Sequence, residues 1–402
     1  MDGRPKLTAM PWRRRMVPRD PGEEHRASTP LELFFDLCFV VAVAQDSAEL
    51  ATHLSEGRFA AGVVSYLLVF FAIWWAWMGF SWFASAFDVD DVPYRFATMI
   101  VLAGVLILAA GVGRGYEHHD FSVIFVGYLV MRAGLETLRA RAAVADPARR
   151  RTMLRYMAGE TGCMAGWAVV IFALPDAALA WGFVVMALVE LAVPGWAERA
   201  ETTPWHPDHI TDRYGAFTII VLGESVLSAT NAVHGALEEH ASPELLLVAG
   251  GGLLTVFGVW WLYFSLPASG LLTNLRIALT WGYGHYLMFV SATAIGVGIE
   301  VNVATTTGEA DIPAVAAGLA LTVPVACCLV LIWLLQVRPH GPDAPGNWVI
   351  PLTGAFVLAA SFTPWPVPVT GGLIALLVVA GVMLHARKTR FAEAAADGPA
   401  TP

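Results

Sequence analysis

Long apolar stretches alternate with short polar breaks along most of the chain. A helix needs about 20 apolar residues to cross a bilayer, and by this measure the pattern predicts about twelve spans. Six are expected over residues 30–50, 59–84, 95–113, 121–143, 153–174 and 177–196, and six over 212–233, 244–266, 277–300, 312–337, 347–365 and 368–386. Two breaks, at 175–176 and 366–371, are the weakest, so ten or eleven spans are the alternative.

The composition agrees with this pattern. Of the 402 residues, 57% are hydrophobic and 14% are charged, whereas about a quarter of the residues in soluble domains are charged. We therefore predict an all-α, polytopic transmembrane helical bundle. The net charge of -9 gives no indication of nucleic-acid binding. The expected partners are the lipid bilayer and a small ion or small molecule, and the oligomeric state stays open.

Both ends of the chain are polar. Residues 1–28 lack the apolar core of a signal peptide and are predicted to form a disordered, basic cytoplasmic tail, and residues 389–402 a second disordered tail. Basic residues concentrate on the cytoplasmic side of membrane proteins. With the N-terminus inside, nearly all of the 24 Lys and Arg residues fall in inner segments. Both termini are therefore predicted to be cytoplasmic.

The two transmembrane halves, residues 29–200 and 201–388, share a pattern that predicts an internal repeat. In each half an acid on the first helix, Asp36 or Glu224, is followed by a helix with a Trp pair. The pairs are Trp74 with Trp75 and Trp260 with Trp261. Six spans per half would give parallel repeats related by an axis along the membrane normal. The alternative is coincidence, because the chain holds 15 Trp residues.

Ionisable side chains inside the predicted spans are the main candidates for function, because a charge there costs roughly 2.5–3.5 kcal/mol and needs a partner or a wet cavity. The candidates taken from these spans are Glu32, Asp36, Arg132, Glu136, Glu160, Glu190, Glu224, His285 and Glu300. Glu32 also fits a capping box with Thr29, followed by Pro30 at the first helical position. Asp36 lies one turn further on the same face, and either a structural ion pair or cation or proton binding would explain it.

Glu224 is the strongest candidate for an ion-binding residue. Arg213 marks the inner end of its helix, and eleven residues at 1.5 Å each place Glu224 roughly 16 Å further, near mid-membrane. Gly223 beside it allows close approach of a backbone or ligand. A buried structural glutamate is the alternative. His285 is either a satisfied core residue or a partner of Glu224.

Arginines are the expected counter-charges. Arg132 and Glu136 lie four residues apart and can pair with each other, or Arg132 can neutralise Asp36 or Glu224, with Arg213 as a further counter-charge. His206 and His209 do not have the spacing of a standard metal site. No metal and no cofactor are predicted, and the four Cys residues lie in apolar runs without a ligand spacing.

Two stretches resemble the bacterial low-temperature-requirement A family. Residues 32–42 match a motif of the ELFFDLxFVxA type, and residues 209–225 match one of the HxxxRxGxFxIIxLGES type. The motif positions present are Glu32, Asp36, His209, Arg213, Gly223 and Glu224. The resemblance implies a multi-pass protein of the bacterial inner membrane, in a family named for a cold-growth phenotype. It implies no biochemical activity.

Three functions are compatible with these residues. The first is a secondary transporter or channel-like protein whose acidic site, formed by Asp36, Glu224, His285 and Glu32, binds a cation or proton. The second is a membrane-embedded enzyme acting on a lipid or isoprenoid-like substrate, in a pocket lined by Trp74, Trp75, Trp260, Trp261 and Gly223. The third is a structural or stress-related membrane protein, in which the acids pair with arginines and leave no cavity.

Overall fold

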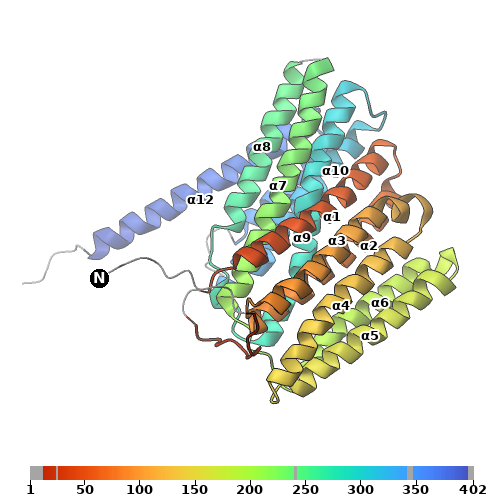
Figure 1. Cartoon of the computed structure of the whole chain (residues 1–402). Coiled ribbons are helices and arrows are strands. Elements are labelled where there is room, and N and C mark those ends of the chain that lie inside the picture. Colours follow the sequence, from red (N-terminus) through yellow and green to blue (C-terminus); the bar gives the residue numbers. More distant parts are fainter. Residues whose placement is uncertain (1–11, 24–25, 240–241, 342–346, 397–402) are drawn as a thin grey trace, which may run out of the picture. The chain divides into compact units, whose positions relative to one another are not determined.

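The structure, a computed structural model, describes residues 12–23, 26–239, 242–341 and 347–396, and all regular elements within these ranges are helical (Figure 1). The α-helices are α1 (Pro30–Ser55), α2 (Phe59–Phe87), α3 (Val92–His118), α4 (Ser122–Ala145), α5 (Arg150–Ala173), α6 (Asp176–Ala197), α7 (Pro207–Glu239), α8 (Pro243–Tyr263), α9 (Leu275–Thr307), α10 (Ala314–Ile332), α11 (Val349–Ala360) and α12 (Pro366–Ala396). The all-α prediction is confirmed.

Within the described residues, nine helices are long and apolar enough to cross a membrane. Helices α1 and α4 are outside this set, although their 26 and 24 residues give lengths of about 39 and 36 Å at 1.5 Å per residue. Each carries several charged side chains. Helix α11 has only 12 residues, roughly 18 Å, so it is shorter than the span predicted over 347–365. The number of spans and the internal repeat stay predictions.

The chain divides into two compact units. Unit 1 contains residues 1–46 and 68–213, and unit 2 contains residues 47–67 and 214–402. The divisions fall inside helices α1, α2 and α7, whereas the sequence pattern placed a boundary between residues 200 and 201.

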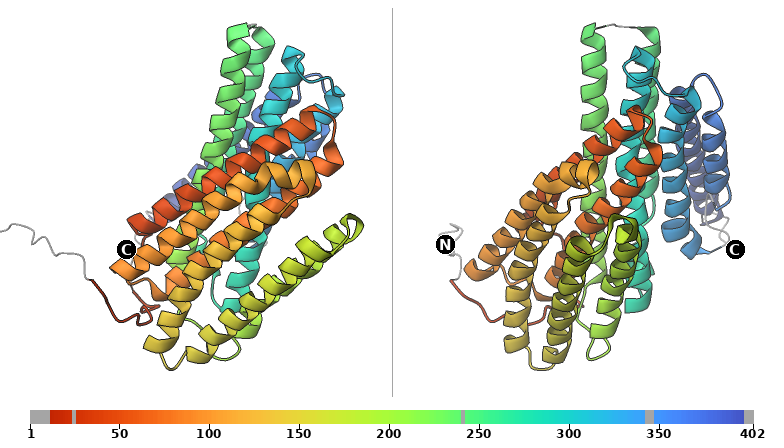
Figure 2. Two further views of the ribbon diagram at one scale, coloured as in Figure 1. Left: turned by 45° about the vertical axis from the view of Figure 1, so that its right-hand side comes forward. Right: turned by 90° about the vertical axis from the view of Figure 1, so that its right-hand side faces the viewer.

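In unit 1, α3 packs very closely against α4, because glycines on both helices remove the side chains between them. A Cβ atom at Gly127 would lie 2.6 Å from the backbone nitrogen of Leu108, and one at Gly104 would lie 2.6 Å from the carbonyl oxygen of Gly127. Small residues bring membrane helices together in this way. Helices α5 and α6 form a hairpin beside α4, seen in yellow and yellow-green in Figures 1 and 2.

The α5–α6 hairpin is less buried than α2 and α3 of the same unit. Only 22% of the apolar stretch of α5 and 17% of that of α6 are buried. Large apolar side chains such as Phe172, Trp181 and Leu188 are more than 60% exposed. A surface of this kind suits the hydrocarbon of a bilayer, where apolar side chains gain nothing from further burial in protein.

Helix α9 is the core of unit 2. It buries 83% of its apolar stretch, which is the behaviour of a helix that is apolar on all sides. Close packing on α10 requires Gly298, where a Cβ atom would lie 2.5 Å from the carbonyl oxygen of Ala320. Asn302, one turn later, donates its side-chain amide to the carbonyl oxygens of Gly298 and Ala317.

The segment that precedes α1 makes specific contacts, although its composition predicted a disordered tail over residues 1–28. Met16 is 1% exposed, the Arg15 guanidinium donates to the carbonyl oxygen of Ala145, and the Arg19 backbone N–H donates to the carbonyl oxygen of Ala86. Residues 1–11 and 24–25 of the predicted tail lie outside the described residues. At the other end α12 continues to Ala396, and residues 397–402 lie outside the described residues.

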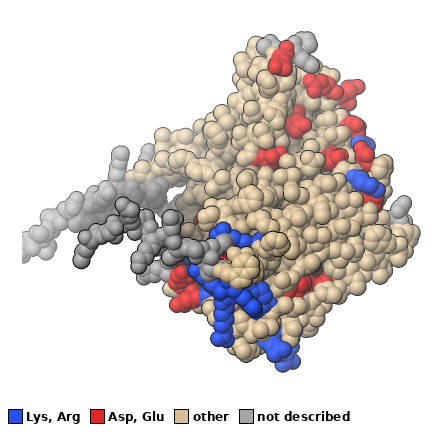
Figure 3. All heavy atoms as spheres, in the orientation of Figure 1, with Lys and Arg blue, Asp and Glu red and all other residues tan. Residues whose placement is uncertain are grey.

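The loops predicted to be cytoplasmic lie at one end of unit 1. The N-terminal segment and the α2–α3 and α4–α5 regions meet where Asp91 accepts hydrogen bonds from the Arg14 backbone and the Arg141 guanidinium. The α4–α5 loop reaches the α6–α7 loop through Arg149 and Thr202. In Figure 3 most of the blue basic side chains gather in the lower part of the view, a few lie among red acidic ones at the right, and broad tan surfaces lie between them. The side of the membrane that this end faces stays a prediction.

Candidate functional site

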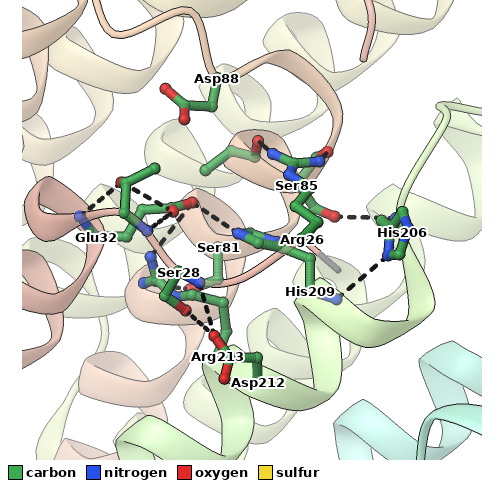
Figure 4. Close-up of polar contacts among 12 residues, drawn as sticks. Arg26, Ser28, Glu32, Ser81, Ser85, Asp88, His206, His209, Asp212 and Arg213 are labelled. Carbon is green, nitrogen blue, oxygen red and sulfur yellow. Dashed lines mark hydrogen bonds and ion pairs between the residues drawn. The ribbon is translucent and has the colours of Figure 1, made fainter. Parts of the chain in front are cut away.

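The two family-like stretches of the sequence meet in unit 1, at the start of α1 and the start of α7 (Figure 4). Oε1 of Glu32 lies 3.0 Å from Nε2 of His209, and Oδ1 of Asp36 lies 2.5 Å from Nη2 of Arg213. All four side chains are at most 1% exposed. We call these four residues the buried charge cluster.

The spacing of the four residues explains how they pair. Glu32 and Asp36 are four residues apart on α1, and His209 and Arg213 are four residues apart on α7. Residues at this spacing lie one above the other on a helix face, about 6 Å apart. Since Glu32 contacts His209 and Asp36 contacts Arg213, the two helix starts run in the same direction and their charged faces match.

Helix α2 holds the cluster from a third side. The indole Nε1 of Trp77 donates to Oδ1 of Asp36 at 2.7 Å, and Arg213 Nη2 donates to the hydroxyl of Ser81 at 3.1 Å. The Arg213 guanidinium also lies over the ring of Phe35, 5.8 Å from its centre. The Asp36–Arg213 pair is therefore fixed by directed contacts as well as by charge.

The capping box predicted at the start of α1 is confirmed. Oε2 of Glu32 accepts from the backbone N–H of Thr29 at 2.8 Å, and the Thr29 hydroxyl accepts from the backbone N–H of Glu32 at 3.3 Å. One carboxylate oxygen thus caps the helix while the other faces His209. The positive end of the α1 dipole favours the ionised form of this carboxyl group.

Arg26, in the N-terminal segment, lies beside the buried charge cluster (Figure 4). Its guanidinium donates to the carbonyl oxygens of Ala84 and Ser85 at the end of α2, where a cation complements the helix dipole. Nearby, both the backbone N–H and the hydroxyl of Ser28 donate to Asp212, at 2.7 and 2.6 Å. The segment before α1 is thereby tied to the start of α7.

Counted with both carboxyl groups ionised and a neutral His209, the buried charge cluster holds two carboxylates and one guanidinium, which gives one net negative charge. In this count a proton on His209 would neutralise it. Several of its buried polar atoms have no hydrogen-bond partner among the described residues: Asp36 Oδ2, His209 Nδ1 and Arg213 Nε. Such atoms are uncommon in protein interiors and indicate a functional role or a bound polar species.

Asp88, in the loop between α2 and α3, is a buried acid at the edge of this region. It is 5% exposed, and the Arg19 guanidinium is 4.0 Å away. Burial, aided by the charge of Glu32, raises the pKa of the Asp88 carboxyl to about 6. Because the folded protein holds this proton more tightly than the unfolded chain does, ionisation of Asp88 lowers stability as the pH rises from about 4 to about 6.

Replacing Asp88 with Asn should remove this pH dependence. A rise of about two pKa units corresponds to about 3 kcal/mol, so Asp88→Asn should unfold at a higher temperature than the wild type at pH 8 and at about the same temperature at pH 4. Thermal unfolding of the detergent-purified protein across this range measures the difference. Asp20→Asn, at an exposed site, is the control and should show no such trend. A constant difference between Asp88→Asn and wild type at every pH would contradict the assignment.

A second network of buried charges joins α2, α4, α5 and α6 in unit 1. Arg132 does not bond to Glu136 as the four-residue spacing suggested, nor to Asp36. Its guanidinium bonds to Glu160 and, at 2.9 Å, to Glu190, and Glu136 instead accepts from Arg139 at 3.1 Å. The partners on neighbouring helices outcompete the local pair, because they bring Arg132 two carboxylates in the interior.

Unit 2 holds the remaining candidates. Glu224 accepts a hydrogen bond from Ser228 at 3.2 Å, and its charge repels that of Glu300 on α9. In the described part of unit 2 neither acid has an ion-pair partner. A Cβ atom at Gly223 would meet no other atom within 4 Å.

His285 has the geometry of a satisfied core residue. Its Nδ1 donates to the carbonyl oxygen of Trp281 at 2.8 Å, and its Nε2 lies 3.0 Å from the Tyr263 hydroxyl oxygen. Both ring nitrogens are therefore hydrogen-bonded, and these partners do not include Glu224.

The Trp residues predicted to line a pocket have different surroundings. Trp74 and Trp75, in unit 1, are 1% and 6% exposed, and the Trp75 indole donates to Glu190 at 2.7 Å. Trp260 and Trp261, in unit 2, are 44% and 47% exposed. The equivalence of the two pairs stays a prediction.

The sequence placed His209 in the second motif and gave it no metal-site spacing, but its partner Glu32 was not predicted. The signal was present: two acids four residues apart and two basic groups four residues apart, both at helix starts predicted to lie on the same side. Arg26, Trp77 and Ser81 were also not predicted. These come from segments without a distinctive pattern, and only the tertiary structure brings them to the cluster.

His206 in the α6–α7 loop and His209 at the start of α7 are both buried. His206 is 4% exposed, its Nε2 donates to the carbonyl oxygen of Glu23 at 2.7 Å, and its backbone N–H donates to Ser85. Among the described residues no group of three or more His, Cys, Asp or Glu side chains has the geometry to hold a metal ion.

Comparisons with known proteins agree with the two motifs. The family described as bacterial low temperature requirement A protein matches residues 27–384. A relative, the uncharacterized protein RA0937 of Rhizobium meliloti (strain 1021), is 28% identical over 252 residues, which cover 60% of this chain and 59% of the relative. The chain thus spans less than two thirds of the length of this relative.

Proposed function

Because the chain belongs to the bacterial low-temperature-requirement A family of membrane proteins, and because its two motifs meet in a buried charge cluster, we propose that it is a proton-coupled secondary transporter or channel-like protein. Glu32 and His209 would bind the coupling proton. Asp36 and Arg213 would be the fixed counter-charges. The observation that carries the proposal is the unbalanced charge of a cluster that is at most 1% exposed.

The energetic cost of such a cluster argues for a role beyond holding helices together. Removing each charge from water costs several kcal/mol, and replacing a buried ion pair with apolar residues is often neutral or stabilising. In membrane proteins, buried ionisable groups typically mark proton relays and ion pathways. A His beside a carboxylate suits proton exchange because its ordinary pKa lies near physiological pH.

The net charge explains why a proton fits better than an anion. One proton on the Glu32–His209 pair neutralises the cluster, and the two atoms that would share it, Oε1 and Nε2, are 3.0 Å apart. Uptake and release of this proton would change the attraction between the starts of α1 and α7. That change supplies a means of coupling protonation to movement of these two helices.

Glu224 and Glu300 provide a second acidic position in the proposal. Two carboxyl groups that repel each other in a membrane interior favour binding of a proton or another cation. Their helices pack tightly, since the Ser225 hydroxyl on α7 donates to the carbonyl oxygen of Ala292 on α9 at 2.9 Å. The pair would thus sit on a rigid element.

A structural role is the second candidate, and a specific observation favours it. Four of the candidate acids of unit 1 are paired with arginines: Asp36 with Arg213, Glu160 and Glu190 with Arg132, and Glu136 with Arg139. This is the pattern expected of a protein that uses ion pairs to join helices. The lipid-active enzyme remains a further alternative, without a matching pocket observation.

Reconstitution into liposomes tests the proposal. With a potassium diffusion potential as the driving force, liposomes containing the protein should change their internal pH faster than protein-free liposomes, as reported by a trapped pH-sensitive dye. Parallel measurements with sodium, potassium and calcium gradients identify any other coupled cation. Absence of flux for every ion, from protein that is folded by circular dichroism, would support the structural role instead.

A further inference from the structure

The network around Arg132 contains three carboxyl groups and two guanidinium groups. The acids are Glu136 on α4, Glu160 on α5 and Glu190 on α6, and the bases are Arg132 and Arg139 on α4. Their side chains are between 1% and 17% exposed. If all five were ionised, the network would hold one uncompensated negative charge in the interior.

The hydrogen-bond donors are shared unequally among the three acids. Both carboxylate oxygens of Glu190 accept hydrogen bonds. The donors are Arg132 at 2.9 and 3.2 Å, Trp75 at 2.7 Å and Trp167 at 3.3 Å. Two guanidinium groups, those of Arg132 and Arg139, bond to Glu160. Both acids are therefore well stabilised as carboxylates.

Glu136 is the acid with the least support. It accepts from Arg139 alone, at 3.1 Å, through the same Nη1 atom that also bonds to Glu160. Its other oxygen, Oε2, is shielded from solvent and has no donor among the described residues. The Glu136 and Glu160 carboxyl groups are neighbours, because one atom, Arg139 Nη1, bonds to an oxygen of each.

Two carboxyl groups can form a hydrogen bond only when one of them carries a proton, because ionised carboxylates are acceptors without a donor. Glu160 and Glu190 each accept from more donors than Glu136 does, so Glu136 is the place for that proton. On the opposite face of α4, Gly127 and Gly134 pack on the backbone of α3.

We propose that Glu136 and Glu160 form a second proton-binding site, in which Glu136 holds one proton and donates it in a hydrogen bond to the Glu160 carboxylate. Its position on α4, α5 and α6 makes it separate from the buried charge cluster on α1 and α7. Protonation makes the network neutral, with two carboxylates balanced by two guanidinium groups. The site does not depend on transport by the protein.

Infrared spectroscopy of the purified protein at pH 7 tests the site through the carbonyl stretch of protonated carboxyl groups. Glu136→Gln should lose intensity corresponding to one protonated carboxyl group per chain. Glu56→Gln is the control, because Glu56 is exposed, is paired with Arg58 and lies outside the network, and it should lose none. An unchanged band in Glu136→Gln, or a loss in Glu56→Gln of the same size, would overturn the proposal.

A second measurement uses the wild-type protein and therefore does not depend on whether the variants fold. In protein labelled with ¹³C at the glutamate carboxyl carbons, solid-state NMR should show at least one protonated carboxyl resonance at pH 7, coupled through space to a carboxylate carbon. The spatial coupling separates this site from any isolated protonated glutamate. If no protonated resonance shows a carboxylate neighbour, Glu136 and Glu160 do not share a proton.

Discussion

Arg213→Gln should be the most destabilising single substitution in the buried charge cluster. The guanidinium group is the cation closest to Asp36, at 2.5 Å, and lies 3.6 Å from Glu32. Its removal leaves two buried carboxylates with only His209 beside them. Breaking a buried pair in this way costs about 3–5 kcal/mol. We expect a large loss of monodisperse protein in detergent, measured by size-exclusion chromatography and thermal unfolding.

A second substitution should restore much of this loss. Asp36→Asn in the Arg213→Gln background removes the uncompensated charge and keeps an oxygen to accept from Trp77. The double variant should therefore be more stable than Arg213→Gln alone, a coupling that a thermodynamic cycle measures. Arg276→Gln, at an exposed position at the start of α9, is the control and should be close to wild type. A double variant no better than the single one would show that the Asp36–Arg213 charge pairing is unimportant.

Local features of the cluster could be predicted from the sequence, whereas its tertiary contacts could not. The capping box of Thr29 and Glu32 depends on residues three apart, and the structure contains it. The contact between Asp36 and Arg213 joins residues 177 positions apart. A single sequence shows which charges need partners but does not show which pairs meet.

Arg132 illustrates the same limit. Its spacing from Glu136 favours a pair on one helix, a contact worth only a few tenths of a kcal/mol on an isolated helix. The packing of α5 and α6 brings Glu160 and Glu190 to the guanidinium. Since buried carboxylates must be compensated, the interhelical contacts decide the outcome, and these depend on how the helices pack.

The amino-acid composition also did not predict that part of the N-terminal segment is ordered. Its polar, Arg-rich sequence is typical of disorder, yet Arg26 is 6% exposed and bonds to the carbonyl oxygens at the end of α2. The last carbonyl groups of a helix are available as acceptors, although that of Ala84 also accepts from the backbone N–H of Asp88. The binding place for Arg26 is thus created by another element, which the local sequence does not reveal.

The second large effect expected is on proton flux. His209→Asn and Glu32→Gln each remove one member of the proposed proton-binding pair while keeping a polar side chain of similar size. Both should lower the initial rate of proton flux by at least tenfold, because neither leaves a carboxylate and an imidazole to share the proton. Arg276→Gln should retain the wild-type rate, since it lies outside the cluster.

The most direct test of proton coupling by the buried charge cluster is the initial rate of potential-driven proton flux. It is measured in liposomes that contain equal amounts of folded wild-type, Glu32→Gln and Arg276→Gln protein. We expect flux with the wild type and Arg276→Gln, and its loss with Glu32→Gln. Equal rates for Glu32→Gln and wild type would contradict the claim that the buried charge cluster carries the coupling proton.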